Sequence, residues 1–251
     1  MITSKDNETI KEIKKLKEKK FRKDKFIVEG IKMVKEAINE KASIDKIVFC
    51  NLAMEKEIED LRNYDYIEVS EKIFKELTDV VTPQGVLAVI NKSINNKKID
   101  EKANYILALD NLQDPGNLGT IIRTADAANL KQIIVSKDTV DAYSPKVVRA
   151  TMGAIFRVNI VEVNDLKETL LNLKNENFEI VTTSLQTNNS IYDIDYNKKV
   201  VVIGNEANGV EKEIIKMSDY KVKIPMPGKA ESLNASVAAS IMIYEYVRQS
   251  L

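Results

Sequence analysis

Short apolar runs alternate with amphipathic stretches along almost the whole chain. In the amino-terminal third, the apolar runs predict strands, and stretches with apolar residues every three or four positions predict helices. The predicted strands are Phe26–Glu29, Ile44–Phe49, Tyr66–Val69 and Val86–Asn91, and the predicted helices are Ile31–Asn39, Met54–Arg62 and Glu71–Thr78. Strands that alternate with helices indicate an α/β domain.

The same alternation resumes after residue 104. The predicted strands are Tyr105–Leu109, Gln132–Ser136, Val158–Val163, Glu179–Ser184, Val200–Ile203 and Lys221–Ile224. The predicted helices are Leu118–Ala128, Pro145–Met152, Leu166–Asn175, Glu211–Met217 and Leu233–Gln249. Several of these strands are continuously apolar, which is typical of parallel strands buried on both faces. We therefore expect an open, mostly parallel sheet with helices on both sides.

A polar stretch without periodicity, Ser93–Lys102, separates the two patterns. It reads as an interdomain linker, although a surface loop within one domain would have the same composition. The restart of the pattern at Tyr105 favours the linker. The sequence thus predicts a smaller domain over residues 1–92, a linker over 93–103 and a larger domain over 104–251.

The composition indicates in which cellular compartment the protein is expected. Of 251 residues, 44% are hydrophobic and 30% are charged, which suits a packed core under a solvated surface. No apolar run reaches the length of a membrane helix, and the charged first residues do not resemble a signal peptide. The single cysteine, Cys50, cannot form an internal disulfide and is expected to be a buried apolar residue. We expect a cytoplasmic protein.

The missing residue types exclude several kinds of chemistry. The chain has no histidine, which rules out a histidine base, a Ser-His-Asp triad and a histidine-ligated metal. It has no cysteine cluster for a metal, and neither GxGxxG nor GxxxxGK[ST] occurs. We therefore expect no metal, no dinucleotide fingerprint and no P-loop.

The net charge is zero, but residues 1–25 hold ten Lys/Arg against five Asp/Glu. A basic amino-terminal helix is typical of a surface that contacts RNA phosphates. The alternative is a solvated amphipathic helix whose Ile10, Ile13 and Leu16 face the core.

Three segments stand out as loops between a strand and a helix. They are Asp110–Ala128, Val201–Val210 and Ile224–Ile241, and they contain five of the eight glycines and three of the five prolines. Glycine and proline supply special backbone geometry, and ligands of α/β sheets bind at the carboxyl ends of strands. The chemistry of this chain is therefore expected in these three loops.

These segments also carry a resemblance to a known family. The first motif is Asn-x-Gly-x-x-x-Arg-Thr-Ala from Asn117, the second is Gly-Asn-Glu-x-x-Gly from Gly204, and the third is Ile-Pro-Met from Ile224 followed by Ser-Leu-Asn-x-Ser-Val-Ala. Together they resemble the three signature motifs of the SpoU (TrmH) RNA ribose methyltransferases, which belong to the SPOUT class. The order and spacing of the motifs fit as well. Phe26–Ile38 and Thr82–Ile90 are similar to the substrate-binding domain that precedes the catalytic domain in many members, so the resemblance covers nearly the whole chain.

The resemblance implies a fold and a reaction that the pattern alone does not reveal. The larger domain would carry the trefoil knot of the SPOUT fold at its carboxyl end. The reaction would move a methyl group from S-adenosylmethionine to a ribose 2′-hydroxyl of RNA, and members with this amino-terminal domain favour ribosomal over transfer RNA. The smaller domain would bind the RNA.

Three residues of the first two motifs match positions that the family uses in catalysis. Arg123 would be the general base proposed for the family or, since a guanidinium stays protonated near pH 7, a clamp for a phosphate and for the forming alkoxide. Asn117 would cap its helix, orient Arg123 or the ribose, or do both. For Glu206 a structural or RNA-orienting role is favoured over catalysis.

The third motif and its neighbours would complete the site. Ser232 and Asn234 match a polar pair near the transferring methyl group, and Ser232 is also the expected N-cap of the last helix. The positions expected to hold S-adenosylmethionine are Thr183, Ser184, Gly204, Ile224, Met226 and Leu233.

The resemblance also implies a homodimer with an active site assembled across its interface. The last helix fits, because it offers more apolar positions than a surface helix needs: Val237, Ala238, Ile241, Met242, Tyr244 and Tyr246. Two alternatives from other classes stay open, a non-catalytic RNA-binding protein that keeps the fold and an α/β enzyme for a small phosphorylated ligand. The missing phosphate-loop fingerprints count against the second.

Overall fold

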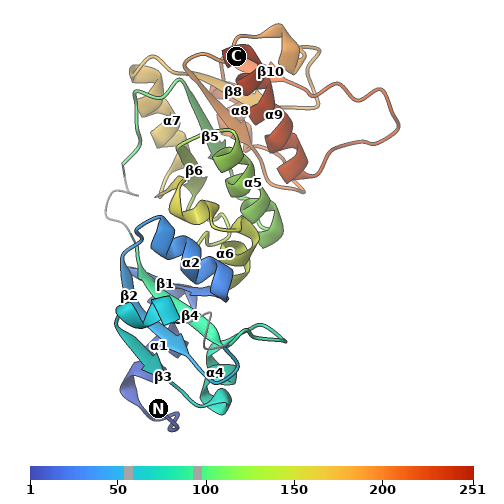
Figure 1. Cartoon of the computed structure of the whole chain (residues 1–251). Helices are drawn as coiled ribbons and strands as arrows, with labels where there is room; N and C mark the ends of the chain where they lie inside the picture. Colours follow the sequence, from blue (N-terminus) through green and yellow to red (C-terminus); the bar gives the residue numbers. More distant parts are fainter. Residues whose placement is uncertain (54–58, 93–97) are drawn as a thin grey trace. The chain divides into compact units, whose positions relative to one another are not determined.

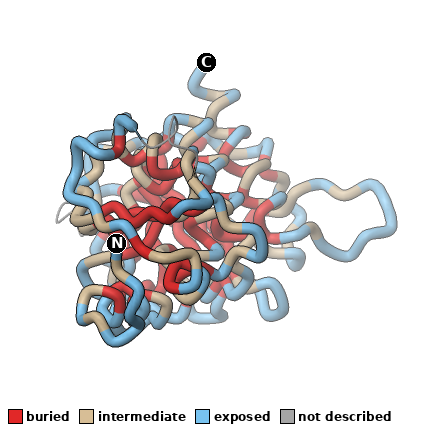
Figure 2. Tube along the Cα trace, turned by 60° about the horizontal axis from the view of Figure 1, so that its bottom comes forward, coloured by how far each residue is buried: buried red, intermediate tan, exposed pale blue. Residues whose placement is uncertain are grey.

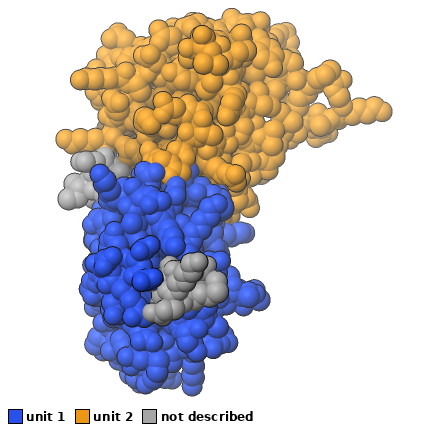
Figure 3. Space-filling view, viewed as in Figure 1, with its two compact units in different colours: residues 1–94, 141–156 blue, residues 95–140, 157–251 orange. Residues whose placement is uncertain are grey.

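The computed structural model describes residues 1–53, 59–92 and 98–251. The chain divides into two compact units, which Figure 3 shows in different colours. Unit 1 comprises residues 1–94 and 141–156, and unit 2 comprises residues 95–140 and 157–251. The division places residues 141–156 with the amino-terminal part, whereas the sequence pattern assigned them to the second domain.

Unit 1 is built on a four-stranded sheet in the order β1-β4-β2-β3. Its strands are β1 (Lys25–Glu29), β2 (Ile44–Phe49), β3 (Tyr66–Glu68) and β4 (Val86–Asn91). β4 pairs antiparallel with β1 and β2, and β2 pairs parallel with β3. Its helices are α1 (Glu8–Lys15), α2 (Ile31–Asn39), α4 (Glu71–Leu77) and α6 (Pro145–Thr151), with 3-10 turns η1 (Lys19–Phe21), η2 (Glu59–Asn63) and η4 (Ala154–Phe156).

One predicted helix of this unit is different in the structure. Met54–Arg62 lies partly outside the described residues, and the described part forms the 3-10 turn η2 instead of an α-helix. The core of the unit contains the apolar face of α1, because Ile10, Ile13 and Leu16 are buried against strand and helix residues. The predicted amphipathic character of the amino-terminal helix is therefore confirmed. Cys50 is buried in the same core, as expected.

The segment 141–156 is tied into unit 1 by a buried ion pair. The Arg22 Nε donates to the Asp141 carboxylate over 2.7 Å, and both side chains are less than 10% exposed. Tyr143 adds a ring contact with Phe26, with 4.9 Å between the centroids. α6 then packs against β1. This part of the chain leaves the larger sheet, completes the smaller unit and returns.

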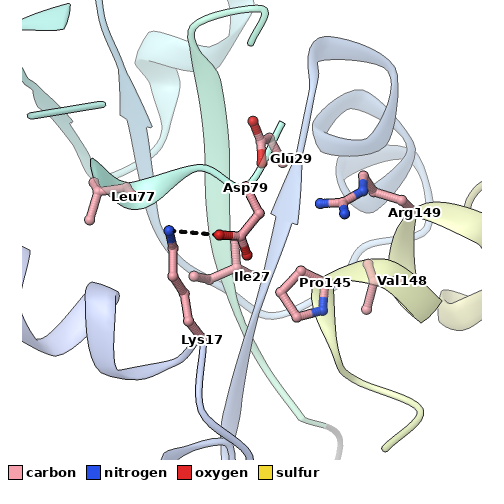
Figure 4. Close-up of a pocket in the computed structure, with 8 residues that line it drawn as sticks. All are labelled: Lys17, Ile27, Glu29, Leu77, Asp79, Pro145, Val148 and Arg149. Carbon is pink, nitrogen blue, oxygen red and sulfur yellow. Dashed lines mark hydrogen bonds and ion pairs between the residues drawn. The ribbon is translucent and has the colours of Figure 1, made fainter. Parts of the chain in front are cut away.

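A small cavity of about 10 Å³ lies beneath α6, lined on one side by Pro145, Val148 and Arg149 (Figure 4). Across it, Lys17 forms an ion pair with Asp79. One Arg149 guanidinium nitrogen is buried there without a hydrogen-bond partner among the described residues. The volume suits about one water molecule, so the cavity is not a ligand site for anything larger.

Unit 2 contains a six-stranded sheet in the order β10-β8-β9-β5-β6-β7, in which every pair of neighbours is parallel. Its strands are β5 (Tyr105–Leu109), β6 (Gln132–Ser136), β7 (Asn159–Val163), β8 (Glu179–Thr183), β9 (Lys199–Ile203) and β10 (Tyr220–Val222). Its α-helices are α5 (Pro115–Ala127), α7 (Leu166–Asn175), α8 (Lys212–Met217) and α9 (Ala235–Ser250), and its described residues also form the 3-10 turn η5 (Ile191–Asp193). The predicted mostly parallel sheet is confirmed.

The central strands of this sheet are fully buried, which explains their continuously apolar sequences. Every residue of β5, β6 and β9 is buried, and Figure 2 shows the buried parts of the trace gathered in the interior. α5 and α9 pack against each other. Among the described helices, none is both long and apolar enough to cross a membrane.

Two connections of unit 2 bear on the site. Residues 98–103, at the end of the predicted linker, are bound to the unit, because Asp100 and Gln132 exchange two hydrogen bonds of 2.7 and 2.8 Å. Between β10 and α9, residues 223–234 form a long loop that extends away from the rest of the unit (Figure 1). This loop carries the third motif.

Candidate active site

The site forms where the chain reverses its path across the sheet. From β5 the chain adds β6 and β7 on one side, and it then adds β8, β9 and β10 on the other. β5 and β9 are therefore neighbours at a topological switch point, with their carboxyl ends at the same edge. Such a point is where open α/β sheets bind ligands. The first motif follows β5, and the second follows β9.

The helix of the first motif begins earlier than the sequence reading placed it. α5 starts at Pro115, and its N-cap is Asp114, whose carboxylate accepts from the Asn117 N–H over 2.8 Å. Proline is favoured at the first helical position because its missing N–H would be unpaired there in any case. The prediction that Asn117 caps this helix is therefore wrong, and its side chain is available for other contacts.

That side chain contacts the glutamate of the second motif. The Asn117 Nδ2 donates to one Glu206 oxygen over 3.0 Å, and the same oxygen accepts from the Asp114 N–H over 3.1 Å. The second Glu206 oxygen accepts from the Gln113 N–H over 3.2 Å. One carboxylate thus satisfies two N–H groups at the start of α5, which favour a negative charge.

These donors decide the protonation state of Glu206. Burial raises the pKa of the carboxyl, but the hydrogen bonds from Asn117, Gln113 and Asp114 act in the opposite direction, and the pKa lies below its ordinary value. Glu206 is therefore ionised at neutral pH. A carboxylate with this pKa is a poor proton acceptor at pH 7, and its geometry is that of a residue that positions the loop and Asn117.

The third motif joins the same network. The Asn234 Nδ2 donates to the Asn117 Oδ1 over 3.0 Å. The Asn234 Oδ1 in turn accepts from the N–H and hydroxyl of Ser236, over 2.9 and 2.7 Å. A continuous line of hydrogen bonds therefore runs from Glu206 through Asn117 to the start of α9.

Asn234 is the N-cap of α9, where its side chain accepts from the N–H groups of Ser236 and Val237. The predicted capping role of Ser232 is therefore wrong. Ser232 is exposed on the long loop and forms no hydrogen bond with any described residue. In this structure it lies outside the network that joins the three motifs.

The loop of the second motif is fixed by its own backbone. Asn205 and Gly209 exchange two main-chain hydrogen bonds of 3.0 and 2.9 Å. A Cβ at Gly204 would come within 2.0 Å of the Gly209 carbonyl carbon, so only glycine allows this close approach. The sequence reading explained Gly204 by contact with a cofactor, whereas the tight loop already requires it.

Arg123 is not part of the network within one chain. It is exposed, and it forms no hydrogen bond or ion pair with any described residue. Six positions separate it from Asn117 along α5, and at 3.6 residues per turn the two side chains point to different faces of the helix. The predicted interaction in which Asn117 orients Arg123 is not formed.

The residues predicted to hold the cofactor lie at three adjacent strand ends. Thr183 ends β8 and Ser184 follows it, Gly204 follows β9 and Ile224 comes shortly after β10. These strands are neighbours in the sheet. Met226 and Leu233 lie further along the long loop, where both are half-buried.

The loop has unused main-chain groups. The N–H and C=O groups of residues 224–233 form no hydrogen bond with the rest of the described chain. Half-buried apolar side chains beside free main-chain donors and acceptors fit a nucleoside ligand. The residues present therefore fit the adenosine part of S-adenosylmethionine.

A polar hollow of about 790 Å³ lies at the same edge of the sheet, over the ends of β5, β6 and β7. It is lined by Asn111, Asn164 and Asn208 and by the cations Lys137, Lys167 and Lys212. None of the predicted site residues lines it.

In the described parts of the chain, no three metal-binding side chains are gathered into one group.

Sequence reasoning missed two acids that shape the site. Asp110, buried at the end of β5, accepts from the Glu211 N–H over 2.7 Å and so joins the first and second motifs again. Its pKa is raised by burial, against the effect of that hydrogen bond. Asp114 is the second, and the signal for it was present, since an Asp before a Pro is a typical helix start.

Comparisons with known proteins match the whole chain. Residues 104–244 match the SpoU rRNA Methylase family, and residues 7–88 match the MRM3-like substrate binding domain. The 23S rRNA (guanosine(2553)-2′-O)-methyltransferase RlmP of Bacillus subtilis (strain 168) is 33% identical over 97% of this chain and 97% of its own length.

Solved structures agree with this likeness. The AdoMet-bound rRNA methyltransferase from Sinorhizobium meliloti superposes with a TM-score of 0.86 at 32% identity, covering 100% of this chain and 98% of that one. The SpoU methyltransferase AviRb from Streptomyces viridochromogenes, in complex with AdoMet, also gives a TM-score of 0.86, at 27% identity over 97% of this chain and 98% of that one.

Proposed function

This chain belongs to the SpoU rRNA methylase family, and we propose on that basis that it transfers a methyl group from S-adenosylmethionine to a ribose 2′-hydroxyl of ribosomal RNA. The observation that carries the proposal is the line of hydrogen bonds from Glu206 through Asn117 to Asn234, which joins the three motifs at the switch point of the sheet. A protein that only kept the fold would not need these polar side chains to meet.

The cofactor supplies a methyl group already activated on a positively charged sulfur. Thr183, Ser184 and Gly204 would hold it at the strand ends, together with Ile224, Met226 and Leu233 on the long loop. The free main-chain groups of that loop would bind the polar edge of the adenine. We also propose that the carboxyl-terminal segment is knotted, as the resemblance to the SPOUT class implies.

The protein must then place the ribose hydroxyl and help it to lose a proton as its oxygen takes the methyl group. The negative charge that develops on this oxygen needs a positive group, and Arg123 has no competing partner among the described residues. Asn117 and Asn234, held by Glu206, would position the ribose through their amides. The proton leaves to solvent.

We further propose a homodimer in which Arg123 acts on the partner subunit's site. Arg123 is exposed and points away from Asn117 of its own chain, and α5 packs on α9, where Val237 and Tyr244 are 46% and 50% exposed. The apolar surface of α9 is smaller than the sequence indicated. Met242 is buried in the unit's own core, and Tyr246 stacks on Tyr105 with 4.5 Å between the ring centroids.

Unit 1 would bind the RNA, and the larger unit would bind the cofactor and carry out the reaction in the cytoplasm. Ribosomal RNA is preferred to transfer RNA because the substrate-binding match covers most of unit 1 and the relative of known target, RlmP, is named for a 23S rRNA position.

The direct test incubates the protein with S-adenosylmethionine labelled in the methyl group and with ribosomal RNA from a strain that lacks the gene. Methyl groups on a 2′-oxygen protect the adjacent phosphodiester from alkali, so the label should appear in alkali-resistant dinucleotides. Transfer RNA serves as the parallel substrate. Binding of ribosomal RNA without any transfer would favour the non-catalytic alternative.

A further inference from the structure

An exposed aromatic ring lies within the basic surface of unit 1. Phe21, the last residue of the 3-10 turn η1, is 40% exposed. The Lys20 ammonium lies 4.8 Å from the centroid of its ring, and the Lys15 ammonium lies 5.7 Å from it. A phenylalanine that only served the core would be buried, and its neighbour Arg22 shows that this turn can bury a long side chain completely.

The turn that presents Phe21 is anchored at both ends. On one side, the Lys17 ammonium donates to the carbonyls of Glu76 and Thr78 and to the Asp79 carboxylate, over 2.9–3.0 Å. On the other side, the buried Arg22 guanidinium donates to the Leu16 carbonyl over 2.8 Å and to Asp141. Phe21 is therefore held in place before any ligand arrives, which lowers the entropy cost of binding.

The lysines near Phe21 are exposed, and one of them, Lys20, forms a solvent-exposed ion pair with Glu18 over 2.8 Å, which phosphate can replace. Lys19 and Lys23 are exposed and have no ion-pair partner among the described residues. Lys14 and Lys17, in contrast, are paired with Glu76 and Asp79. The basic segment thus divides into lysines that hold the fold and exposed lysines, of which Lys15 and Lys20 lie over the Phe21 ring and Lys19 and Lys23 flank it in the sequence.

We propose that Phe21 is a stacking platform for an unpaired base of the RNA substrate. Lys15, Lys19, Lys20 and Lys23 would bind the phosphates on either side of that base. An aromatic ring between exposed cations is the arrangement by which proteins bind single-stranded RNA, with bases on the ring and backbone on the charges. The proposal rests on the proposed RNA substrate and names a specific contact with it.

The contributions of the ring and of the lysines to RNA affinity should differ in their dependence on salt concentration. Loss of the ring in Phe21→Ala removes no charge, so affinity for RNA should fall about 5- to 100-fold with an unchanged salt dependence. Loss of charge in Lys19→Gln/Lys23→Gln should instead flatten the salt dependence. Lys14→Gln is the matched control, because Lys14 is already paired with Glu76.

Fluorescence gives a readout that needs no activity. The chain has no tryptophan, so Phe21→Trp creates a single tryptophan at the platform, which can be excited selectively over the tyrosines. A short single-stranded oligoadenylate should quench it in a saturable way, because the base stacks on the indole. Tyr192→Trp is the control, since Tyr192 is 59% exposed in unit 2 and has no lysine over its ring among the described residues.

The outcomes separate this inference from the proposed function. Quenching at position 21 but not at 192, with weaker binding by Phe21→Ala, supports the platform. Methyl transfer and RNA binding that are unchanged in Phe21→Ala would overturn the platform alone. Absence of both RNA binding and methyl transfer in the unaltered protein would overturn the platform and the proposed function together.

Discussion

The Asn117 amide donates to the Glu206 carboxylate over 3.0 Å and so connects two loops that are 89 residues apart in the chain. The bond joins the loop that follows β5 to the loop that follows β9. The position of Asn117 therefore depends on a residue far from it in the sequence.

Replacing Glu206 by glutamine should reduce methyl transfer strongly, by about 10²-fold, while leaving the fold intact. The amide has only one acceptor oxygen, and its NH₂ group would meet the N–H donors that the carboxylate now accepts. The measurement is single-turnover methyl transfer at saturating RNA and cofactor. Glu211→Gln is the control, because the Glu211 side chain takes no part in the network. Its methyl transfer should stay near normal, and an equal loss of methyl transfer in both variants would contradict the role of Glu206.

The lowered pKa of Glu206 also predicts how the stability of the protein depends on acid pH. The pKa of Glu206 is lowered in the folded protein, so its contribution is complete above the ordinary pKa of a glutamate and is lost as the pH falls through the lower, folded value. We expect the difference in stability between the unaltered protein and Glu206→Gln to shrink as the pH is lowered below about 4. Urea unfolding at several pH values measures it. A difference that grows on acidification would contradict the network.

Mixing two inactive variants tests whether Arg123 acts across a dimer. Arg123→Ala and Asn117→Ala should each lose transfer by about 10²–10³-fold. If Arg123 serves the partner subunit's site, a mixed dimer holds one intact site of two. Random exchange of equal amounts should then restore about a quarter of the normal activity.

The control for this experiment mixes Asn117→Ala with Glu206→Gln, which lie in the same network and should not complement each other. Light scattering must also give a dimeric mass. A monomer, or no recovery of activity in the first mixture, would assign Arg123 to its own chain.

The buried pair of Arg22 and Asp141 should be important for the stability of unit 1. Asp141→Asn leaves a buried guanidinium without its counter-charge, and we expect the free energy of unfolding to fall by about 3–5 kcal/mol. The double change Arg22→Met/Asp141→Leu should cost less, because neither charge remains. Lys14→Gln, which breaks an exposed pair that solvent screens, should leave the free energy of unfolding nearly unchanged.

Glu29 should make the stability of the folded protein depend on pH in the opposite direction from Glu206. Burial raises the pKa of its carboxyl, although the Thr78 hydroxyl and the nearby Arg149 act against this shift. A raised pKa favours the folded protein below the ordinary glutamate value, and this advantage is lost as the pH rises through the raised value. Glu29→Gln should therefore remove a decline of stability with rising pH that starts near pH 4.5. Thermal unfolding between pH 4 and 7 measures it, and parallel curves for the two proteins would contradict the assignment.

The strands were predictable because their physics is local. β2, β4, β5 and β6 begin and end where the apolar runs do, since a parallel or central strand must be apolar on both faces. The starts of α5 and α9 were not predicted. α5 and α9 begin at residues fixed by Asp114 and Asn234, and several polar residues nearby competed for the same role.

Three of the predicted site residues meet in the structure, and their contacts could not be predicted from the sequence. The motifs named Glu206, Asn117 and Asn234, and the structure joins them. Nothing local in the sequence indicated that Ser232 and Arg123 would lie outside this line. Their places depend on a long loop and on the direction of a helix face, which are fixed only by packing.

The membership of residues 141–156 in unit 1 has a consequence for the order of folding during synthesis. The strands of the small sheet leave the ribosome first, but Arg22 stays without its counter-charge and the α6-facing side of β1 stays uncovered until Phe156 has been made. The nascent chain must therefore hold an incomplete amino-terminal unit while β5 and β6 of the larger sheet emerge. The amino-terminal unit is translated first, but it can finish folding only after part of the larger sheet has already been made.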